Sequence, residues 1–500
     1  MVVVLSLSED ESTASLHLKA LWIPDFAGMT ECAGMSPEKR PMDRTTDMLS
    51  SYACGLTYEE LEPAVVEQVK RTLLDTLGCA IGGYDSEPAA IARSLADGVQ
   101  SGMASRVLGT SLHTTPDLAA FANGVAVRYL DCNDSYFSPG GGHPSDMIPA
   151  VLAVADPLKA DGPTVITAVA LAYEVFCRLS DEVVASDLGW DQGIFSVIGA
   201  VCGAAKVMGL DREQTGNAIS LAISPHLPLG VTRTGELSMW KGCAAASASR
   251  SAVFAAQLAA KGMSGPGEPF EGRRGLWEQA VGRAVSIPNF PLGDLRSQDD
   301  PFRITQTIFK AYPSQIHTQA PIGLALQLRD KVSVDSIRSI HIDTYKVAAS
   351  TASSEPEKWD PKTRETADHS IPWLVASALL DGPVTPTSFA DERIASEAIR
   401  NVMSRMTLVE DADFTARYPG EYNCRITLTG SDCERHTAHT AWPKGHRRNP
   451  MSDAEVEAKF RNFAGAALSG GQSDRALEAI WSLDKLPNLE SVFDAFIIQQ

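Results

Sequence analysis

Residues 118–155 read LAAFANGVAVRYLDCNDSYFSPGGGHPSDMIPAVLAVA, a sequence in which two apolar runs flank a polar loop. The small and apolar residues of 118–130 and of 147–155 are typical of closely packed helices. The sequence therefore predicts a helix-to-helix junction that gathers four ionisable side chains, namely Asp131, Asp134, His143 and Asp146.

The loop has features that suit ligand binding. The glycines Gly140–Gly142 allow close approach of backbone to a ligand, and Pro144 ends the loop with a fixed φ. A helix beginning after Ser145 would direct free N–H groups toward an anion. Alternatively, Ser145 or Asp146 caps that helix and His143 is an ordinary loop histidine. We expect capping for Asp146 but a functional role for His143, whose glycine and acid neighbours have no evident packing purpose.

Composition and charge limit the class of protein. A chain of 500 residues exceeds the usual size of one hydrophobic core, so we expect two domains. The 44% hydrophobic and 21% charged residues are typical of a soluble globular protein. A formal charge of -19 argues against a nucleic-acid partner or an anionic membrane surface. An anionic substrate would then need a local cluster of basic side chains.

The cysteines and the first residues predict the compartment. Nine cysteines occur without a Cys-x-x-Cys pair or a zinc-site spacing, so we expect a reducing cytoplasm and no metal. We find no stretch long and apolar enough to span a membrane, and the segment after Met1 lacks a basic leader.

The chain up to about residue 292 predicts helices after an irregular or disordered extension over residues 1–44, for which a later start at Met35, Met42 or Met48 is an alternative. Thr57, Asp211 and Ser452 each precede a Glu or Gln by three residues, the pattern of a capping box at a helix start. Residues 164–179 are apolar on nearly all sides, which predicts a buried helix. From residue 49 to about 286 we expect no strand.

A second region after residues 288–293 mixes strands with helices. Ile340, Ile342 and Thr344 alternate with polar residues, as do those of 424–429, and each alternation predicts a strand. Helical stretches at 316–328 and 371–380 make this region α+β, and the chain from Ser452 onward returns to helix. Asp368 or Ser370 is interpreted as the cap of the helix at 371–380.

Several familiar catalytic motifs are absent from the sequence. It has no phosphate-binding P-loop, no dinucleotide-binding Gly-x-Gly-x-x-Gly after a strand, no Gly-x-Ser-x-Gly and no His-Glu-x-x-His. His436 and His439 lie in a predicted strand, where their spacing places the rings on opposite faces. Chemistry therefore falls to acids, histidines and lysines.

Asp131-Cys-Asn-Asp134 followed by Gly142-His-Pro-Ser-Asp146 closely resembles the signature of the MmgE/PrpD family, which contains 2-methylcitrate dehydratases and, more distantly, cis-aconitate decarboxylase. The likeness extends from about residue 49 to the C-terminus through Gly189-Trp-Asp191, Met239-Trp-Lys-Gly-Cys-Ala-Ala245, Lys310-Ala-Tyr-Pro313, Thr366-Ala-Asp-His-Ser-Ile-Pro372, and Pro443-Lys-Gly-His446 with Asn449-Pro450. The resemblance implies a mainly α fold, in which a large helical domain over 45–292 and 450–500 contains an inserted, smaller α+β lid domain over 293–449.

Removal of water from a 3-hydroxy tricarboxylate requires cations for the carboxylates, a base and an acid. Lys241, Lys310 and His143 supply positive charge, while Asp131, His143 and Tyr345 are the candidates for proton transfer. Lys241 either extends to solvent or, as we expect, faces a carboxylate. For Tyr345, core packing is the alternative. The resemblance implies the same positions, and we assign His143 as base and Asp131 as a group that orients or charges a partner, with base and acid otherwise open.

The candidate substrate-binding residues come from the loop and from the seam between the two regions, where small-ligand pockets occur, and for Asp191 and Gln192 from the family resemblance. They are Lys310, His317, Asp134, Ser135, Asp191 and Gln192. Gln192 is a departure, because dehydratases of the family often have a histidine at or near this position. Its amide removes a possible proton carrier.

The leading hypothesis is a cofactor-independent dehydratase acting on 2-methylcitrate, citrate or a related polycarboxylate, with the role in propionate metabolism that the resemblance implies. Alternatives within the enzyme class are decarboxylation of cis-aconitate and epimerisation of a dicarboxylate. A catalytically silent carboxylate-binding homologue is the alternative of another class. Apolar helical segments near Val169 and Ala244 and the resemblance both predict a homodimer.

Overall fold

The computed structural model describes residues 42–288, 290 and 300–499, most of which lie in helices, so the mainly α class is confirmed. The predicted extension lies outside the described residues except for its last three. There, Asp43 is buried and accepts a hydrogen bond from the Thr46 backbone N–H, which caps α1 (Arg44–Gly55). The packed part of the chain therefore begins before the predicted boundary at residue 45.

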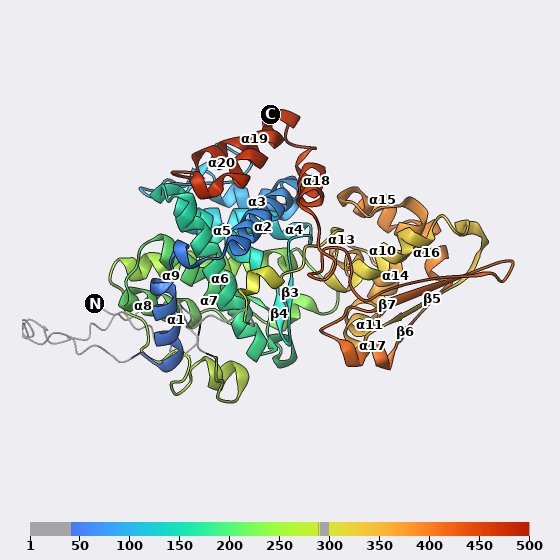
Figure 1. Cartoon of the computed structure of the whole chain (residues 1–500), viewed down its shortest axis with the longest axis horizontal. Coiled ribbons are helices and arrows are strands. Elements are labelled where there is room, and N and C mark those ends of the chain that lie inside the picture. The colour runs from blue at the N-terminus through green and yellow to red at the C-terminus, as the bar shows by residue number, and fades with distance from the viewer. Residues whose placement is uncertain (1–41, 289, 291–299, 500) are drawn as a thin grey trace, which may run out of the picture. The chain divides into compact units, whose positions relative to one another are not determined.

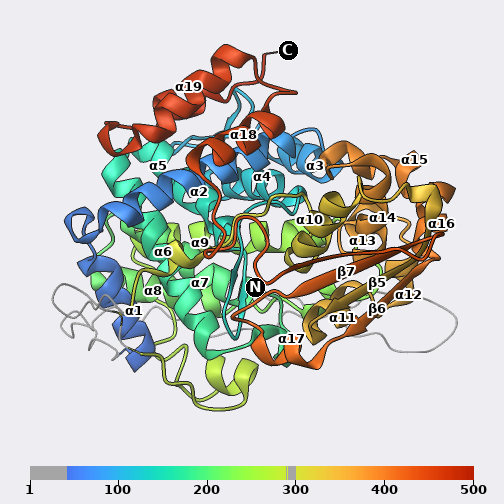
Figure 2. The ribbon, with the colours of Figure 1, turned by 45° about the vertical axis from the view of Figure 1, so that its right-hand side comes forward.

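A large hydrophobic core joins the helices of the N-terminal half to those of the C-terminus. Figure 1 shows α18–α20 beside α2 and α5, and Figure 2 shows α18 against α2 from a second side. The helices are α2 (Pro63–Gly82), α3 (Glu87–Ala96), α4 (Pro116–Tyr129), α5 (Ile148–Leu158), α6 (Gly162–Glu182), α7 (Gly193–Val207), α8 (Arg212–Ile223), α9 (Trp240–Ala260), α18 (Asp453–Ala464), α19 (Gly470–Trp481) and α20 (Glu490–Ala495).

Small residues set the close packing of α4 against α9. A Cβ atom on Gly124 would lie 2.8 Å from the Cβ of Ala246, too close for any side chain larger than hydrogen. Both helices are rich in alanine, so their backbones approach each other closely. This contact brings the end of α4 beside the start of α9.

Helix α6 corrects the expectation about membrane spans. By length and composition it is long and apolar enough to cross a membrane, contrary to the expectation that no stretch of the chain is. However, 89% of its most apolar window is buried inside the fold, as expected for the central helix of a hydrophobic core.

The capping boxes predicted at Asp211 and Ser452 are confirmed as the caps of α8 and α18. The one at Thr57 closes only a 3₁₀ turn, with the Thr57 N–H donating to Glu60 Oε2 at 2.9 Å. Helix α2 begins later, at Pro63, because the residue before a proline is pushed out of the helical region.

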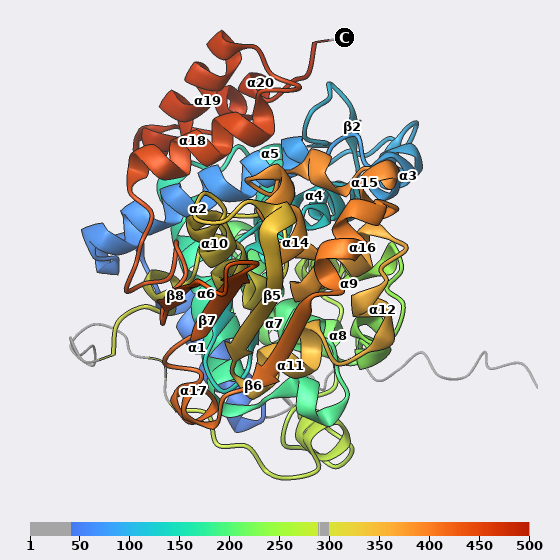
Figure 3. The ribbon, with the colours of Figure 1, turned by 90° about the vertical axis from the view of Figure 1, so that its right-hand side faces the viewer.

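The α+β region contains a four-stranded sheet in the order β6-β5-β7-β8 (Figure 3). The predicted strands appear as β5 (Ile337–Thr344), β7 (Cys424–Gly430) and β8 (Arg435–Thr440). The fourth strand, β6 (Met406–Glu410), was not expected from the sequence, and it pairs parallel to β5 at the sheet edge. β6 has only one buried side chain, so its sequence lacks the alternation of a half-buried strand.

A second hydrophobic core includes Ile340 and Ile342 of β5, and in it α10 packs against strands β7 and β8 and against α14. The predicted helices at 316–328 and 371–380 are confirmed as a 3₁₀ turn followed by α10, and as α14. The helices of this region are α10 (Gln319–Leu328), α11 (Lys346–Ala352), α12 (Pro356–Trp359), α13 (Arg364–Ala367), α14 (Ile371–Asp381), α15 (Asp391–Ile394), α16 (Glu397–Met403) and α17 (Ala412–Arg417).

Residues Met42–Gln500 form one compact unit despite having two principal cores, so the division into a helical domain and an inserted lid stays a prediction. The expectation of no strand before residue 286 is wrong in detail. Two short antiparallel pairs occur, β1 (Ser105–Arg106) with β2 (His113–Thr114), and β3 (Tyr136–Phe137) with β4 (Gly141–Gly142).

Candidate active site

Asp131 is the centre of a buried cluster of charges. It follows α4 with a φ of 50°, and its side chain is 1% exposed. Its Oδ1 atom accepts from Lys310 Nζ at 2.5 Å and from Arg128 Nη1 at 2.6 Å, while Lys241 Nζ lies 2.9 Å from Oδ2. Although burial raises its pKa, the charges of Arg128, Lys241 and Lys310 hold the pKa of Asp131 well below its usual range. Asp131 is thus a permanent anion that gathers three cations.

Three members of the cluster, Arg128, Asp368 and His369, were not selected from the sequence. Lys241 Nζ also lies 3.1 Å from Asp368 Oδ2, and Asp368 Oδ1 is 2.5 Å from His369 Nδ1. His369 Nε2 is 3.6 Å from Asp131 Oδ2. Asp368 is therefore an ion-pair partner rather than a cap, while Ser370 does cap α14 by accepting from the Trp373 N–H. The Asp-His pair within the family-like segment 366–372 was the available signal.

Both lysines of the cluster are more deeply buried than the sequence indicated. Lys241 is 2% exposed and faces carboxylates, as predicted, and Lys310 is fully buried. Lys310 Nζ also donates to the Asp131 carbonyl oxygen at 2.7 Å, so one ammonium holds both the side chain and the backbone of Asp131. Burial lowers the pKa of Lys310, opposed by the charge of Asp131.

Asp131, Asp368 and His369 form the one group of possible metal ligands within the described part of the chain, with ligand atoms within 4.8 Å of one another. Their oxygens already bind Lys241, Lys310 and Arg128. A divalent cation at this position would meet the repulsion of three positive charges at close range. The carboxylates of this group are thus already occupied by side-chain cations, and the expectation that the enzyme uses no metal stays a prediction.

His143 follows the β3–β4 hairpin and points toward Asp131. Its Nδ1 atom is 2.8 Å from the Asp134 carbonyl oxygen and 3.1 Å from Ser135 Oγ. A carbonyl oxygen only accepts, so Nδ1 holds the proton and Nε2 keeps a free lone pair. Nε2 lies 3.9 Å from Asp131 Oδ1. Burial and the charges of Arg128 and Lys310 lower the pKa of His143 well below 6.5, which keeps the imidazole neutral.

Two of the glycines before His143, Gly140 and Gly142, allow close packing within the protein rather than the predicted close approach to a ligand. A Cβ atom on Gly142 would lie 1.8 Å from Gln192 Oε1, the atom that accepts the His143 backbone N–H at 2.7 Å. A Cβ atom on Gly140 would lie 2.5 Å from the Ser180 carbonyl oxygen. Both positions are therefore closed to larger residues, and Gln192 fixes the backbone that presents the imidazole.

The predicted cap and anion-binding helix end after this loop are both wrong. Residues Pro144–Met147 form a short 3₁₀ helix without a side-chain cap, and α5 follows it. The Ser145 N–H donates to Asp134 Oδ1 at 3.1 Å, so it is already bonded. Asp146 instead accepts from Asn133 Nδ2 at 2.8 Å and from Gln192 Nε2 at 3.1 Å. Burial raises the pKa of Asp146 to about 6.

Tyr345 and His317 lie at the sheet side of the cluster. The Tyr345 hydroxyl is 2.5 Å from His317 Nδ1, and both side chains are buried. Burial lowers the pKa of His317 to about 3 and raises the pKa of Tyr345 well above its usual value. The Tyr345 ring also stacks on the Tyr418 ring, with 4.7 Å between the ring centroids. Tyr345 therefore has a packing role in addition to a hydroxyl group that could transfer a proton.

Asp191 lies beside the cluster rather than inside it. Its Oδ2 atom accepts from Arg233 Nε at 2.6 Å, and Arg233 Nη1 donates to the Lys241 carbonyl oxygen at 3.1 Å. Asp191 therefore supports the start of α9, from which Lys241 extends.

The Asp134 carboxyl faces away from His143, accepting from the Tyr173 hydroxyl at 2.9 Å. Burial raises its pKa to about 7, against roughly 3.9 in an unfolded chain. Between these values the folded state retains a proton that the unfolded state has lost, so this group makes stability fall as pH rises.

We expect Asp134→Asn to remove this pH dependence. The amide still accepts from the Ser145 N–H and can donate to the Tyr173 hydroxyl, as the protonated acid would. In urea unfolding, the stability of the variant relative to the parent should increase by on the order of 2 kcal/mol between about pH 5 and about pH 8. A difference that does not change with pH would show that Asp134 is ionised throughout.

The chain matches two family models, the MmgE/PrpD N-terminal domain over residues 47–286 and the MmgE/PrpD C-terminal domain over residues 312–485. It is 27% identical to a probable 2-methylcitrate dehydratase of Saccharomyces cerevisiae, over 79% of each chain. It is 26% identical to the 2-methylcitrate dehydratase of Escherichia coli K12, over 86% of this chain and 92% of the relative. It is also 25% identical to human cis-aconitate decarboxylase, over 88% of this chain and 92% of the relative. The chain therefore belongs to the MmgE/PrpD family.

Proposed function

We propose that this protein is a cofactor-independent lyase that removes water from a hydroxy polycarboxylate such as 2-methylcitrate or citrate. The observation that supports this proposal most is the neutral imidazole of His143, whose free Nε2 atom lies 3.9 Å from the carboxylate that gathers Lys241, Lys310 and Arg128. A base beside concentrated positive charge suits removal of a proton next to a substrate carboxylate. The names of the relatives support the same reaction class.

In this proposal, the substrate carboxylates bind Lys241 and Lys310 by sharing them with Asp131 and Asp368. His143 Nε2 takes a proton from the carbon next to a carboxylate, and the electrons of that C–H bond form the new double bond. The hydroxyl group on the neighbouring carbon receives a proton and departs as water. No electrons are gained or lost overall, so the elimination needs no redox cofactor.

The proton for the departing hydroxyl is assigned to Tyr345. Its raised pKa keeps the hydroxyl protonated, and His317 is its hydrogen-bond partner at 2.5 Å. The low pKa of His317 keeps that imidazole neutral, so its hydrogen bond orients the Tyr345 hydroxyl without taking the proton from it. Asp131 holds the cations in place and stabilises the imidazolium that forms on His143.

Decarboxylation of an unsaturated tricarboxylate is the second candidate. Gln192, which anchors the His143 backbone and Asp146, cannot donate a proton to a leaving hydroxyl as a histidine would. Decarboxylation has no leaving hydroxyl and needs only carbon protonation, so the glutamine does not hinder it. One relative is named for this activity.

Incubation of the pure protein with a panel of di- and tricarboxylic acids, with and without a chelator, separates the candidates. We expect 2-methylcitrate or citrate to give absorbance from a new conjugated double bond, unchanged by the chelator. Released carbon dioxide would favour the decarboxylase instead. Binding of the acids without any turnover would indicate a silent homologue.

A homodimer remains part of the proposal. Leu229, Val231 and Trp240 are 59%, 70% and 50% exposed, and they lie close in sequence to Lys241. Covering these apolar side chains with a second copy would remove them from water near the site. A mass measurement that gives only monomer would contradict this part.

A further inference from the structure

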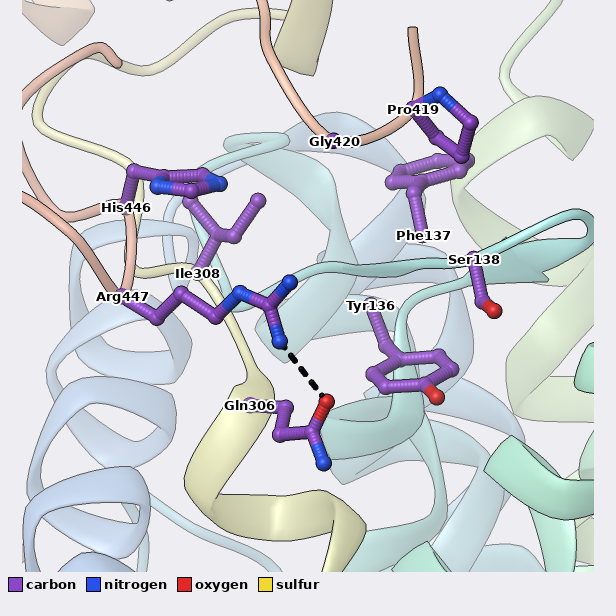
Figure 4. Close-up of a pocket in the computed structure, with 9 residues that line it drawn as sticks. All are labelled: Tyr136, Phe137, Ser138, Gln306, Ile308, Pro419, Gly420, His446 and Arg447. Carbon is purple, nitrogen blue, oxygen red and sulfur yellow. Dashed lines mark hydrogen bonds between the residues drawn. The ribbon is translucent and has the colours of Figure 1, made fainter. Parts of the chain in front are cut away.

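A cavity of about 140 Å³ lies beside the candidate active site (Figure 4). It is bounded by strand β3, by the segment around Gln306 and Ile308, and by two loops of the α+β region. Its lining combines aromatic, apolar and polar side chains, contributed by Tyr136, Phe137, Ser138, Gln306, Ile308, Pro419, Gly420, His446 and Arg447. A volume of this size is sufficient for a carboxylate-bearing group with several waters.

One layer of aromatic side chains separates this cavity from the reacting groups. The ring of Phe137, in the cavity wall, lies 6.0 Å from that of His317, the hydrogen-bond partner of Tyr345. The ring of His446 lies 5.6 Å from that of Tyr422, which contacts His317 in turn at 6.3 Å. A molecule in the cavity is therefore one side chain away from the candidate site.

The positive charge of the cavity belongs to Arg447. Its Nη1 atom donates to Gln306 Oε1 at 2.9 Å, and Figure 4 shows these two side chains pointing toward each other. The partner is a neutral amide, and across residues 42–288, 290 and 300–499 no carboxylate forms an ion pair with Arg447. Burial and the neighbouring arginines lower the pKa of His446 to about 4, so this imidazole is neutral. Arg447 thus keeps an uncompensated charge on a chain whose formal charge is -19.

We infer that this cavity is the entrance for the polycarboxylate and that Arg447 binds one of its carboxylates there before the molecule reaches Lys241 and Lys310. This inference rests on the proposed function. A planar guanidinium suits a carboxylate, and a local cation is needed to attract an anion to an acidic protein. Because Arg447 does not reach the reacting atoms, it affects capture of the substrate rather than the chemical step.

Arg447→Gln and Arg448→Gln are the matched pair of variants for the test. Both remove one positive charge from neighbouring positions, but Arg448 lies over the Trp442 ring at 5.2 Å and does not line the cavity. Arg447→Gln should raise KM about ten- to a hundredfold while kcat stays within about twofold. Arg448→Gln should leave both constants near those of the parent. Added salt should lower kcat/KM more in the parent than in Arg447→Gln.

Stopped-flow association of propane-1,2,3-tricarboxylate, which lacks a hydroxyl to eliminate, separates this inference from the proposed function. Slower association with Arg447→Gln than with Arg448→Gln supports the entrance. Equal association rates of the two variants and an active parent overturn the entrance and leave the proposed function standing. A parent that neither binds this tricarboxylate nor converts any polycarboxylate overturns both.

Discussion

Replacement of His143 by Gln should lower kcat at least ~100-fold while the fold remains intact, because loss of a general base costs about 10²–10⁴ in rate. The glutamine amide can still donate to the Asp134 carbonyl oxygen, the partner of His143 Nδ1. It has no basic nitrogen to replace Nε2. Initial rates, circular dichroism and the melting temperature of parent and variant are the measurements.

His113→Gln is the matched control, since His113 Nδ1 also lies 3.0 Å from a carbonyl oxygen, that of Ser111, but the His113 side chain is exposed. It should keep parental turnover. If His143→Gln is stable and retains more than about a tenth of the parental kcat, the base is Asp131 or Tyr345 instead.

The pH profile gives a second test of His143. The base is active when neutral, and its buried environment lowers the pKa of His143 well below 6.5. A lower pH is therefore needed to protonate and inactivate it. The acid limb of kcat/KM should therefore fall at a pH below that of an ordinary histidine. An acid limb centred on the unperturbed value would show that the imidazole is not in the buried environment described.

Replacement of Lys310 by Met should cost both stability and substrate binding. The fully buried ammonium holds the Asp131 carboxylate and carbonyl, and removing one partner of a buried ion pair costs about 3–5 kcal/mol. Arg128 and Lys241 remain near Asp131 and should limit the loss to the lower end of this range. Urea unfolding gives the stability, and calorimetry with a tricarboxylate gives the binding.

Lys362→Met is the control, because Lys362 forms an exposed pair with Asp360 at 2.7 Å. Surface pairs contribute about 0–1 kcal/mol, so this variant should unfold almost as the parent does. If Lys310→Met is as stable as Lys362→Met and binds the tricarboxylate as tightly as the parent, then Lys310 is neither a structural partner of Asp131 nor part of the binding site.

Features set by local sequence were predictable. The alternating residues that include Ile340 and Ile342 predicted β5, and the capping boxes at Asp211 and Ser452 predicted two helix starts, since these signals lie within a few residues. The expectation that Lys241 faces a carboxylate is confirmed. It was predictable because a lysine that is buried in a helix of small residues needs a carboxylate partner to hold its charge.

Features set by distant contacts were not predictable. Gly140 and Gly142 indicated close approach of the backbone to a ligand, whereas their absent side chains make room for Ser180 and Gln192, which are far away in the sequence. Asp146 had the position of a cap, but Asn133 and Gln192 occupy its oxygens. The contact of His369 with Asp131 likewise depends on how the two cores meet, which no local pattern contains.

A crystal structure with propane-1,2,3-tricarboxylate bound tests the central claim most directly, because the claim concerns where a polycarboxylate sits. We predict carboxylate oxygens within about 3.2 Å of Lys241 Nζ and Lys310 Nζ, and a substrate carbon within about 3.5 Å of His143 Nε2. A tricarboxylate bound elsewhere, with both lysines still paired only to Asp131 and Asp368, would contradict it.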